Sequence, residues 1–360
     1  MSERVDRLAA GLGDTGVDVM LVTDLVNVRY LTDYYGTNGL ALVGPNTRAF
    51  ITDFRYTEQA AEQVESSFER SEAPLELFDA ITEVLPGGER RLGFEDAHLT
   101  VRQHDRLREL LPDRVSLVGV EGAVERLRAV KHPDEVERIR AATQLADAAF
   151  RKVVADGLIG RTEAEVALAL EVEMRRLGAR KPSFETIIAG GAYGALPHAV
   201  PRDETIAPGK LVVIDWGAEL DGYCSDCTRT LAAGAVDGEA SYVYELVLRA
   251  QLAGLDAVRA GARCREVDSA ARQVIEAAGH GEHFGHGLGH GVGLEVHEGP
   301  RLSQRADESA ELEAGNVVTV EPGVYVPGAF GVRIEDLVVV EDEERCEVLT
   351  SLPKELTVVG

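Results

Sequence analysis

Cysteine is scarce in this chain, which has only four among its 360 residues. Scaffolds that depend on disulfide bonds carry far more, so a disulfide framework is excluded. Cys224 and Cys227 form a C-x-x-C, a spacing also found in zinc and redox sites, but the chain has no second such pair. The pair lies in a strand-like pattern, and we interpret it as two residues that happen to flank Asp226.

Long apolar runs are also absent. No stretch approaches the roughly 20 apolar residues that cross a bilayer, and the charged N-terminus MSERVDRLAAGL is not a secretory signal. Lysine is rare, with five residues, and the net charge is −25. This balance argues against nucleic acid as a partner, because no basic surplus can neutralise phosphates. The sequence therefore predicts a cytoplasmic protein with no membrane or nucleic-acid partner.

Residues 1–124 have the pattern of an α/β unit. Turn or helix signals separate the strand-like runs VDVMLVT, LALVGP and RAFITD, and FRYTEQAAEQVESSF has a helical pattern. The segment LPGGERRLGFED adds a turn and another strand. Between residues 120 and 131 the pattern changes to a charged helix, which places a domain boundary near residue 124.

The remainder of the chain repeats one arrangement twice. Pro133 begins a long helical pattern, and Thr162 with Glu165 forms a capping box for a second helix before several strands. Two further helical patterns, at 240–261 and 265–279, then precede a glycine-histidine segment and more strands. This repetition predicts a duplicated α+β layer with a site between the halves.

Asp215 and Asp226 lie in strand-like segments joined by a predicted hairpin turn at Asp221-Gly222. If those two residues form the loop, Asp215 lies opposite Thr228, and Asp226 shares its face one diagonal step away. Two carboxylates roughly 7 Å apart on one face repel each other unless cations lie between them. The alternative is a pair of solvated acids on an edge strand, which the apolar run LVVI before Asp215 disfavours.

Glu321 and Glu335 lie in two further strand-like segments, VVTVEP and VRIED. A loop with an odd number of residues centred on Gly328 would place these two carboxylates opposite each other. Buried acids need partners, because an unpaired ion in a medium of low dielectric constant is very costly. A salt bridge to Arg333 is the alternative to metal ligation here.

Five of the nine histidines lie between His280 and His297. Alternate glycines from 285 to 293 exclude a regular helix around His290 and permit a close approach of the backbone. Imidazole and carboxylates together are ligands that hold divalent metals and leave a position open for water. The sequence therefore predicts a hydrolytic metal site. His198, in GALPHAV, is isolated and alone would be interpreted as a loop residue.

With these residues assembled, the chain resembles the metallopeptidase family that includes proline dipeptidases, Xaa-Pro aminopeptidases and methionine aminopeptidases. RAVKHPDEVERIRAA matches the start of its catalytic domain. VNVRYLTDYYG and ITDFRYTEQA match the extra N-terminal domain of the proline-directed members, which methionine aminopeptidases lack. The resemblance covers nearly all of the chain. It implies an α+β fold class, with a creatinase-like α/β N-terminal domain over residues 1–124 and a duplicated pita-bread catalytic domain over residues 125–360.

The resemblance also implies a dinuclear metal site. Asp226 and Glu335 would bridge two divalent ions, Asp215 would complete the ligands of one ion, and His290 and Glu321 those of the other. Manganese or cobalt is favoured, and zinc stays open.

Further roles around the metals follow from the same resemblance. Glu321 would take the proton of the attacking water, while His198 and His297 would orient the scissile carbonyl and assist proton transfer. Arg301 would hold the terminal carboxylate of a dipeptide. The expected substrate-binding residues are His198, His286, His297, Arg301 and Arg333.

The implied reaction is the hydrolysis of an Xaa-Pro bond by a hydroxide that bridges the two ions. The substrate would be a small peptide with proline after the scissile bond. Arg301 favours a dipeptidase, and an Xaa-Pro aminopeptidase acting on longer peptides is the alternative. A metal-free creatinase-like hydrolase and a non-catalytic binding module are disfavoured, because all five ligand residues that the resemblance implies are present. Family habit also implies a homodimer.

Overall fold

The structure is a computed structural model that describes residues 2–360. The chain forms two compact units, Met1–Arg128 and Ala129–Gly360. Helix α6 (Ala123–Ala129) contains both the predicted boundary at residue 124 and the point at which the units separate. Among the described residues, no helix is both long and apolar enough to cross a membrane.

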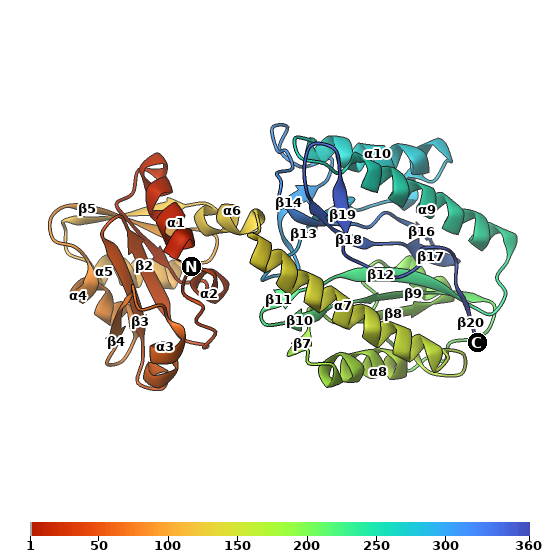
Figure 1. Cartoon of the computed structure of the whole chain (residues 1–360), viewed down its shortest axis with the longest axis horizontal. Coiled ribbons are helices and arrows are strands. Elements are labelled where there is room, and N and C mark those ends of the chain that lie inside the picture. The colour runs from red at the N-terminus through yellow and green to blue at the C-terminus, as the bar shows by residue number, and fades with distance from the viewer. Residues whose placement is uncertain (1) are drawn as a thin grey trace. The chain divides into compact units, whose positions relative to one another are not determined.

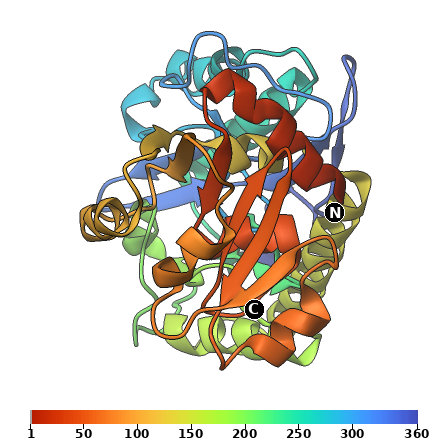
Figure 2. The same cartoon turned by 90° about the vertical axis from the view of Figure 1, so that its left-hand side faces the viewer.

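Within residues 2–128, six strands form one mixed sheet in the order β4-β3-β2-β1-β5-β6 (Figure 2). The pairs β1–β2 and β2–β3 are antiparallel, whereas the pairs β3–β4, β1–β5 and β5–β6 are parallel. The strands are β1 (Val19–Val22), β2 (Leu40–Gly44), β3 (Thr47–Thr52), β4 (Glu69–Glu72), β5 (Arg90–Glu95) and β6 (Val115–Val120). The helices before α6 are α1 (Ser2–Thr15), α2 (Leu25–Thr32), α3 (Thr57–Gln63), η1 (Leu77–Ala80), α4 (Ile81–Val84) and α5 (Val101–Leu110).

The helix predicted in FRYTEQAAEQVESSF is shorter than its pattern suggests, because α3 covers only Thr57–Gln63. The carboxylate of Asp53 accepts hydrogen bonds from the backbone N–H and the Nε of Arg55. These bonds hold residues 53–56 in a turn, so the helix begins only after them.

The second unit repeats its element order, as the sequence predicts (Figure 1). The first half contains α7 (Pro133–Ala155), α8 (Glu163–Arg176), β7 (Lys181–Pro182), β8 (Ile187–Gly190), η2 (Gly191–Ala195), β9 (Lys210–Trp216), β10 (Ala218–Leu220), β11 (Tyr223–Cys224) and β12 (Cys227–Ala233). The second half contains α9 (Gly238–Ala257), α10 (Cys264–Ala277), η3 (Gly281–His283), β13 (Gly289–Gly291), β14 (Glu298–Leu302), β15 (Val317–Val320), β16 (Gly323–Val326), β17 (Phe330–Arg333), β18 (Asp336–Val340), β19 (Cys346–Val348) and β20 (Val358–Val359).

Local signals in the sequence fix where the helices of this unit begin. Pro133 is the first residue of α7, after an N-cap at His132. Thr162 and Glu165 form the predicted capping box at the start of α8, with both reciprocal hydrogen bonds present. Each pair of helices packs mainly on the strands of its own half, and Ile139 of α7 also packs with Val317 and Leu337 of the other half. The first half buries Trp216, which stacks on Phe150 with ring centroids 4.1 Å apart.

A long hairpin in the first half carries Asp215 and Asp226. Asp221 and Gly222 form its two-residue turn with φ values of 49° and 87°, the left-handed region that such a turn requires. Thr228 pairs with Asp215, so the predicted register is confirmed. The ladder is interrupted between β11 and β12, where Ser225 and Asp226 lie outside both strands.

A second long hairpin, in the other half, carries Glu321 and Glu335. β16 pairs with β17 around a loop centred on Gly328, and β15 pairs with β18 in the same register. The two glutamates lie in the break between these ladders and face each other, as predicted. Asp226, Glu321 and Glu335 therefore lie where a hairpin is interrupted, whereas Asp215 lies within β9 close to the break.

The glycines beside His290 are needed because other backbone segments pass very close to them. A Cβ at Gly289 would lie 2.0 Å from the carbonyl oxygen of Thr319, and one at Gly291 would lie 2.0 Å from that of Gly299. Neither glycine has a positive φ. Close packing of β13 between its neighbours, rather than an unusual backbone angle, therefore explains these residues.

We predict that Gly289→Ala destabilises the protein by about 1–3 kcal/mol, because the new methyl group displaces the β15 backbone. Gly285→Ala is the matched control in the same segment, since a Cβ there would meet no atom within 4 Å. Urea denaturation of both variants checks this. Equal stability of the two variants would contradict the packing argument.

Candidate functional site

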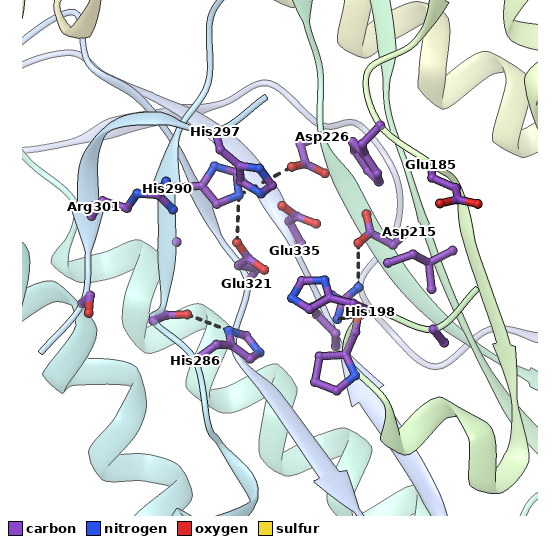
Figure 3. A pocket seen from close by; sticks show the side chains of 18 of the residues that line it. Glu185, His198, Asp215, Asp226, His286, His290, His297, Arg301, Glu321 and Glu335 are labelled. Atoms are coloured by element: carbon purple, nitrogen blue, oxygen red, sulfur yellow. Dashed lines mark hydrogen bonds and ion pairs between the residues drawn. The ribbon is translucent and has the colours of Figure 1, made fainter. Parts of the chain in front are cut away.

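A pocket of about 490 Å³ opens between the two hairpins of the second unit (Figure 3). Every site residue predicted from the sequence lines it. These are Asp215, Asp226, His290, Glu321, Glu335, His198, His286, His297, Arg301 and Arg333. The structure therefore brings together side chains that are spread over more than a hundred positions of the sequence.

Asp215 is held by an arginine from the other half. The Nη2 of Arg333 donates to Asp215 Oδ2 at 2.6 Å, while Asp215 Oδ1 is buried and has no hydrogen-bond partner among residues 2–360. The salt bridge considered from the sequence as an alternative for Arg333 is therefore present, but it involves Asp215 rather than either glutamate. It also leaves one oxygen of Asp215 unpaired.

Glu335 is positioned by the first hairpin. Its backbone N–H donates to the carbonyl of Thr228, and the Thr228 hydroxyl donates to Glu335 Oε2 at 2.7 Å. The same hydroxyl accepts a hydrogen bond from Arg333 Nε at 2.9 Å. Glu335 Oε1 is buried without a partner in the described chain. One threonine thus orients both a carboxylate and the arginine that holds Asp215.

His290 turns one ring nitrogen towards the acids. Its Nδ1 lies 3.1 Å from the carbonyl oxygen of Gly291, to which a protonated Nδ1 can donate. Its Nε2 lies 3.2 Å from Glu321 Oε1 and 3.7 Å from Asp226 Oδ2. Without a metal, a proton on Nε2 would donate to Glu321. When the ring carries its proton on Nδ1 instead, the Nε2 lone pair faces the carboxylates, an orientation suited to a metal ligand.

Burial and mutual repulsion perturb the four carboxyl groups. Burial raises the pKa of Asp226 and Glu335 well above the usual range, and the neighbouring acids add to the effect. Burial also raises the pKa of Asp215, although Arg333 opposes it. Burial would raise the pKa of Glu321 too, but the hydrogen bond with His290 outweighs it and lowers that pKa to about 2. Without cations, burial and repulsion therefore favour the protonated forms of Asp215, Asp226 and Glu335.

The donors at this site fit divalent cations. Asp226, His290 and Glu335 each offer a ligand atom, and these atoms lie within 4.8 Å of one another. Asp215 and Glu321 lie outside this trio but line the same pocket. Asp215 Oδ1 and Glu335 Oε1, which have no hydrogen-bond partner among the described residues, are available to a cation. Carboxylate and imidazole donors of this kind suit manganese, cobalt and zinc.

Three other histidines surround the acids. His297 lies edge-on to His290, with ring centroids 4.3 Å apart, and partial burial with its cationic neighbours lowers the pKa of His297 to about 4. His286 Nε2 lies 2.9 Å from the hydroxyl of Tyr325. His198 reaches the pocket from the loop after η2, on the opposite side from Arg301 (Figure 3).

Arg301 extends from β14 beside His290, its cross-strand partner in the ladder. Its side chain is exposed and makes no hydrogen bond or ion pair with any described residue. Arg333 is different, because its guanidinium donates to Asp215, Thr228, Tyr325 and the carbonyl of Pro197. Among these two arginines, only Arg301 has its donors available to a ligand.

The sequence did not reveal the roles of Thr228 and Tyr325. The register placed Thr228 opposite Asp215, but nothing indicated that its hydroxyl would reach the other hairpin. Tyr325 joins His286 to Arg333 through its hydroxyl, at 2.9 and 2.8 Å. It lies in an ordinary strand pattern, and no local signal separates it from a core tyrosine.

The C-x-x-C pair has no place in this cluster. Cys224 and Cys227 are buried, and their Sγ atoms contact the backbone carbonyls of Leu294 and Glu335. Burial raises the pKa of Cys224 to about 12, so the thiol stays protonated.

Comparisons with known proteins agree with the geometry. Residues 137–342 match metallopeptidase family M24, and residues 4–130 match the creatinase/prolidase N-terminal domain. The chain therefore belongs to metallopeptidase family M24, which confirms the predicted family, fold class and enzyme class.

Individual relatives match over the full chain. An uncharacterised peptidase of Bacillus subtilis is 42% identical, with 99% of this chain and 100% of that protein covered. The structure of an Xaa-Pro dipeptidase from Bacillus anthracis is 40% identical, covers 99% of both chains and has a TM-score of 0.94. That of an X-Pro aminopeptidase from Thermotoga maritima is 35% identical, covers 99% of this chain and 100% of its own, and has a TM-score of 0.88.

We predict that Thr228→Val lowers the free energy of unfolding by about 1–3 kcal/mol, because it leaves buried groups of Glu335 and Arg333 without partners. Thr228→Ser is the matched control, since it retains the hydroxyl. Urea denaturation compares the two variants with the wild type. A valine variant as stable as the serine variant would show that the hydroxyl does not join the hairpins.

Proposed function

We propose that this protein hydrolyses Xaa-Pro peptide bonds and acts mainly as a dipeptidase. Family membership supports the peptidase chemistry, and the similar Bacillus anthracis protein is described as an Xaa-Pro dipeptidase. The observation that carries the dipeptidase assignment is the unpaired guanidinium of Arg301 at the pocket.

Five side chains would hold two divalent ions. Asp226 and Glu335 would bridge them, Asp215 would complete one set of ligands, and His290 with Glu321 the other. The close trio of donor atoms and the unpaired carboxylate oxygens support this assignment. Manganese or cobalt is our first choice, with zinc as the alternative. When bound, such ions supply Lewis-acid activation of water and of the scissile carbonyl.

The protein's own residues would transfer protons, orient the scissile carbonyl and support the pocket. Glu321 would accept a proton from the attacking water, because its carboxylate stays ionised beside His290. His297, neutral at pH 7, would donate a hydrogen bond to the oxygen that becomes negatively charged on the carbonyl. His198 would orient the same carbonyl from the opposite side, while His286 and Arg333 would support the pocket wall.

Arg301 would hold the terminal carboxylate of an Xaa-Pro dipeptide. An arginine can bind a carboxylate through two parallel hydrogen bonds, which rewards a substrate that ends directly after proline. A longer peptide has no carboxylate at that position. The second candidate is an Xaa-Pro aminopeptidase, which the likeness to the Thermotoga maritima structure favours. We also propose a homodimer and a division into domains at residue 124, and the cytoplasmic location stays a prediction.

We predict that the purified protein with manganese or cobalt cleaves Ala-Pro, and that Arg301→Ala lowers kcat/KM for Ala-Pro about tenfold or more. Cleavage of the tripeptide Ala-Pro-Ala should change much less, because it presents no carboxylate to Arg301. Arg305→Ala is the control, since Arg305 is an exposed arginine outside the pocket. Product release measured side by side for both peptides provides the test.

Two results would contradict parts of this proposal. An equal fall in kcat/KM for both peptides in Arg301→Ala would contradict the binding of a terminal carboxylate by Arg301 and favour the aminopeptidase. No cleavage of either peptide by the wild type at saturating metal would remove the Xaa-Pro assignment itself.

A further inference from the structure

Glu185 is a charged residue of the pocket that the mechanism does not use. Its side chain is exposed, lines the pocket, and makes no hydrogen bond or ion pair with any described residue. In Figure 3 it lies beyond Asp215, on the side away from Asp226, His290 and Glu335, whereas Arg301 lies at the opposite end. The pocket thus has the unpaired carboxylate of Glu185 at one end and the unpaired guanidinium of Arg301 at the other.

An irregularity in the sheet carries Glu185 to this position. Ile187 pairs with Asp215 in one ladder and Pro182 pairs with Ala218 in the next. Residues 183–186 therefore lie opposite only residues 216 and 217. Such extra residues in a strand bulge out and redirect side chains. Both Phe184 and Glu185 of this bulge line the pocket.

The surroundings of Glu185 suit a long side chain with a positive end. Phe184, Ile187, Ala199 and Val200 give the same pocket apolar lining, and Val200 is 54% exposed. A lysine or arginine side chain can lay its methylene stem along such walls and keep its charged end in water. A carboxylate at the rim then pairs with that charge.

We propose that Glu185 is a specificity-determining residue that favours substrates with lysine or arginine as Xaa. This inference rests on the proposed Xaa-Pro function and names the substrate class of the same site. With the terminal carboxylate at Arg301 and the scissile carbonyl beside the acid cluster, Xaa extends towards Asp215 and Glu185.

The side chain of Xaa, rather than its amino group, is the part that meets Glu185. The amino group is attached to the Cα next to the scissile carbonyl, so it stays near the cluster and Asp215. Glu185 lies beyond Asp215 (Figure 3), and a flexible four-carbon stem would extend in that direction.

The test compares kcat/KM for Lys-Pro and norleucine-Pro, two dipeptides of similar length that differ in side-chain charge. In the wild type with saturating manganese, Lys-Pro should be the better substrate. Glu185→Gln should lower the ratio of Lys-Pro to norleucine-Pro about two- to fivefold, the range for a solvent-exposed ion pair. The fall in this ratio should arise mainly from a higher KM for Lys-Pro, and it should become smaller as salt is added.

Two further variants sharpen the result. Glu245→Gln removes an equal charge from an exposed position of α9 and should leave the ratio unchanged. Glu185→Arg should reverse the preference, so that Glu-Pro becomes better than Gln-Pro.

The outcomes separate the two proposals. In one outcome, the wild type cleaves norleucine-Pro while Glu185→Gln leaves the ratio of kcat/KM values unchanged, or lowers kcat/KM equally for both dipeptides. Either result would show that Glu185 does not determine specificity, and the Xaa-Pro function would stand. If the wild type cleaves neither dipeptide, the proposed function fails, and this inference fails with it.

Discussion

The repulsion among four carboxylates in one buried pocket is the constraint on which the rest of the site depends. Asp215, Asp226 and Glu335 are at most 9% exposed, and the cation of Arg333 beside Asp215 offsets part of their charge. Burial and repulsion therefore favour the protonated forms, which cannot serve as ligands. Two divalent cations would neutralise the four acids and remove that conflict. Without them, the buried cluster costs the fold stability.

The two halves of the second unit are joined at the acids themselves. Thr228 contacts Glu335 through backbone and side chain, and Arg333 crosses in the other direction to hold Asp215. Behind them, the buried Arg229 donates to the carbonyl of Glu335 and to the carboxylate of Asp336. The positions of these acids therefore depend on contacts between strands that are about a hundred residues apart in sequence. A change in either hairpin is transmitted to the acids of both.

Much of this arrangement could be predicted because the acids lie on regular hairpins. The turn at Asp221-Gly222 and the loop centred on Gly328 each set a register, and that register determines which carboxylates face each other. The features that could not be predicted from the local sequence pattern are those that depend on side-chain contacts or on pairing between strands. Asp53 shortens α3 through a side-chain turn, and the bulge that redirects Glu185 appears only when two ladders are compared. The role of Tyr325 arises from its neighbours in space, since its own strand pattern is ordinary.

The number of divalent ions that the protein binds tests the proposed metal site most directly. Metal-free protein would be dialysed to equilibrium against excess manganese, and the bound metal and the protein would then be quantified in the same sample. Two ions per chain, reduced by Glu335→Gln, is the predicted result, because one buried cluster would hold both. Binding of no ion, or the same number of ions in that variant as in the wild type, would contradict the claim that these acids exist to hold metal.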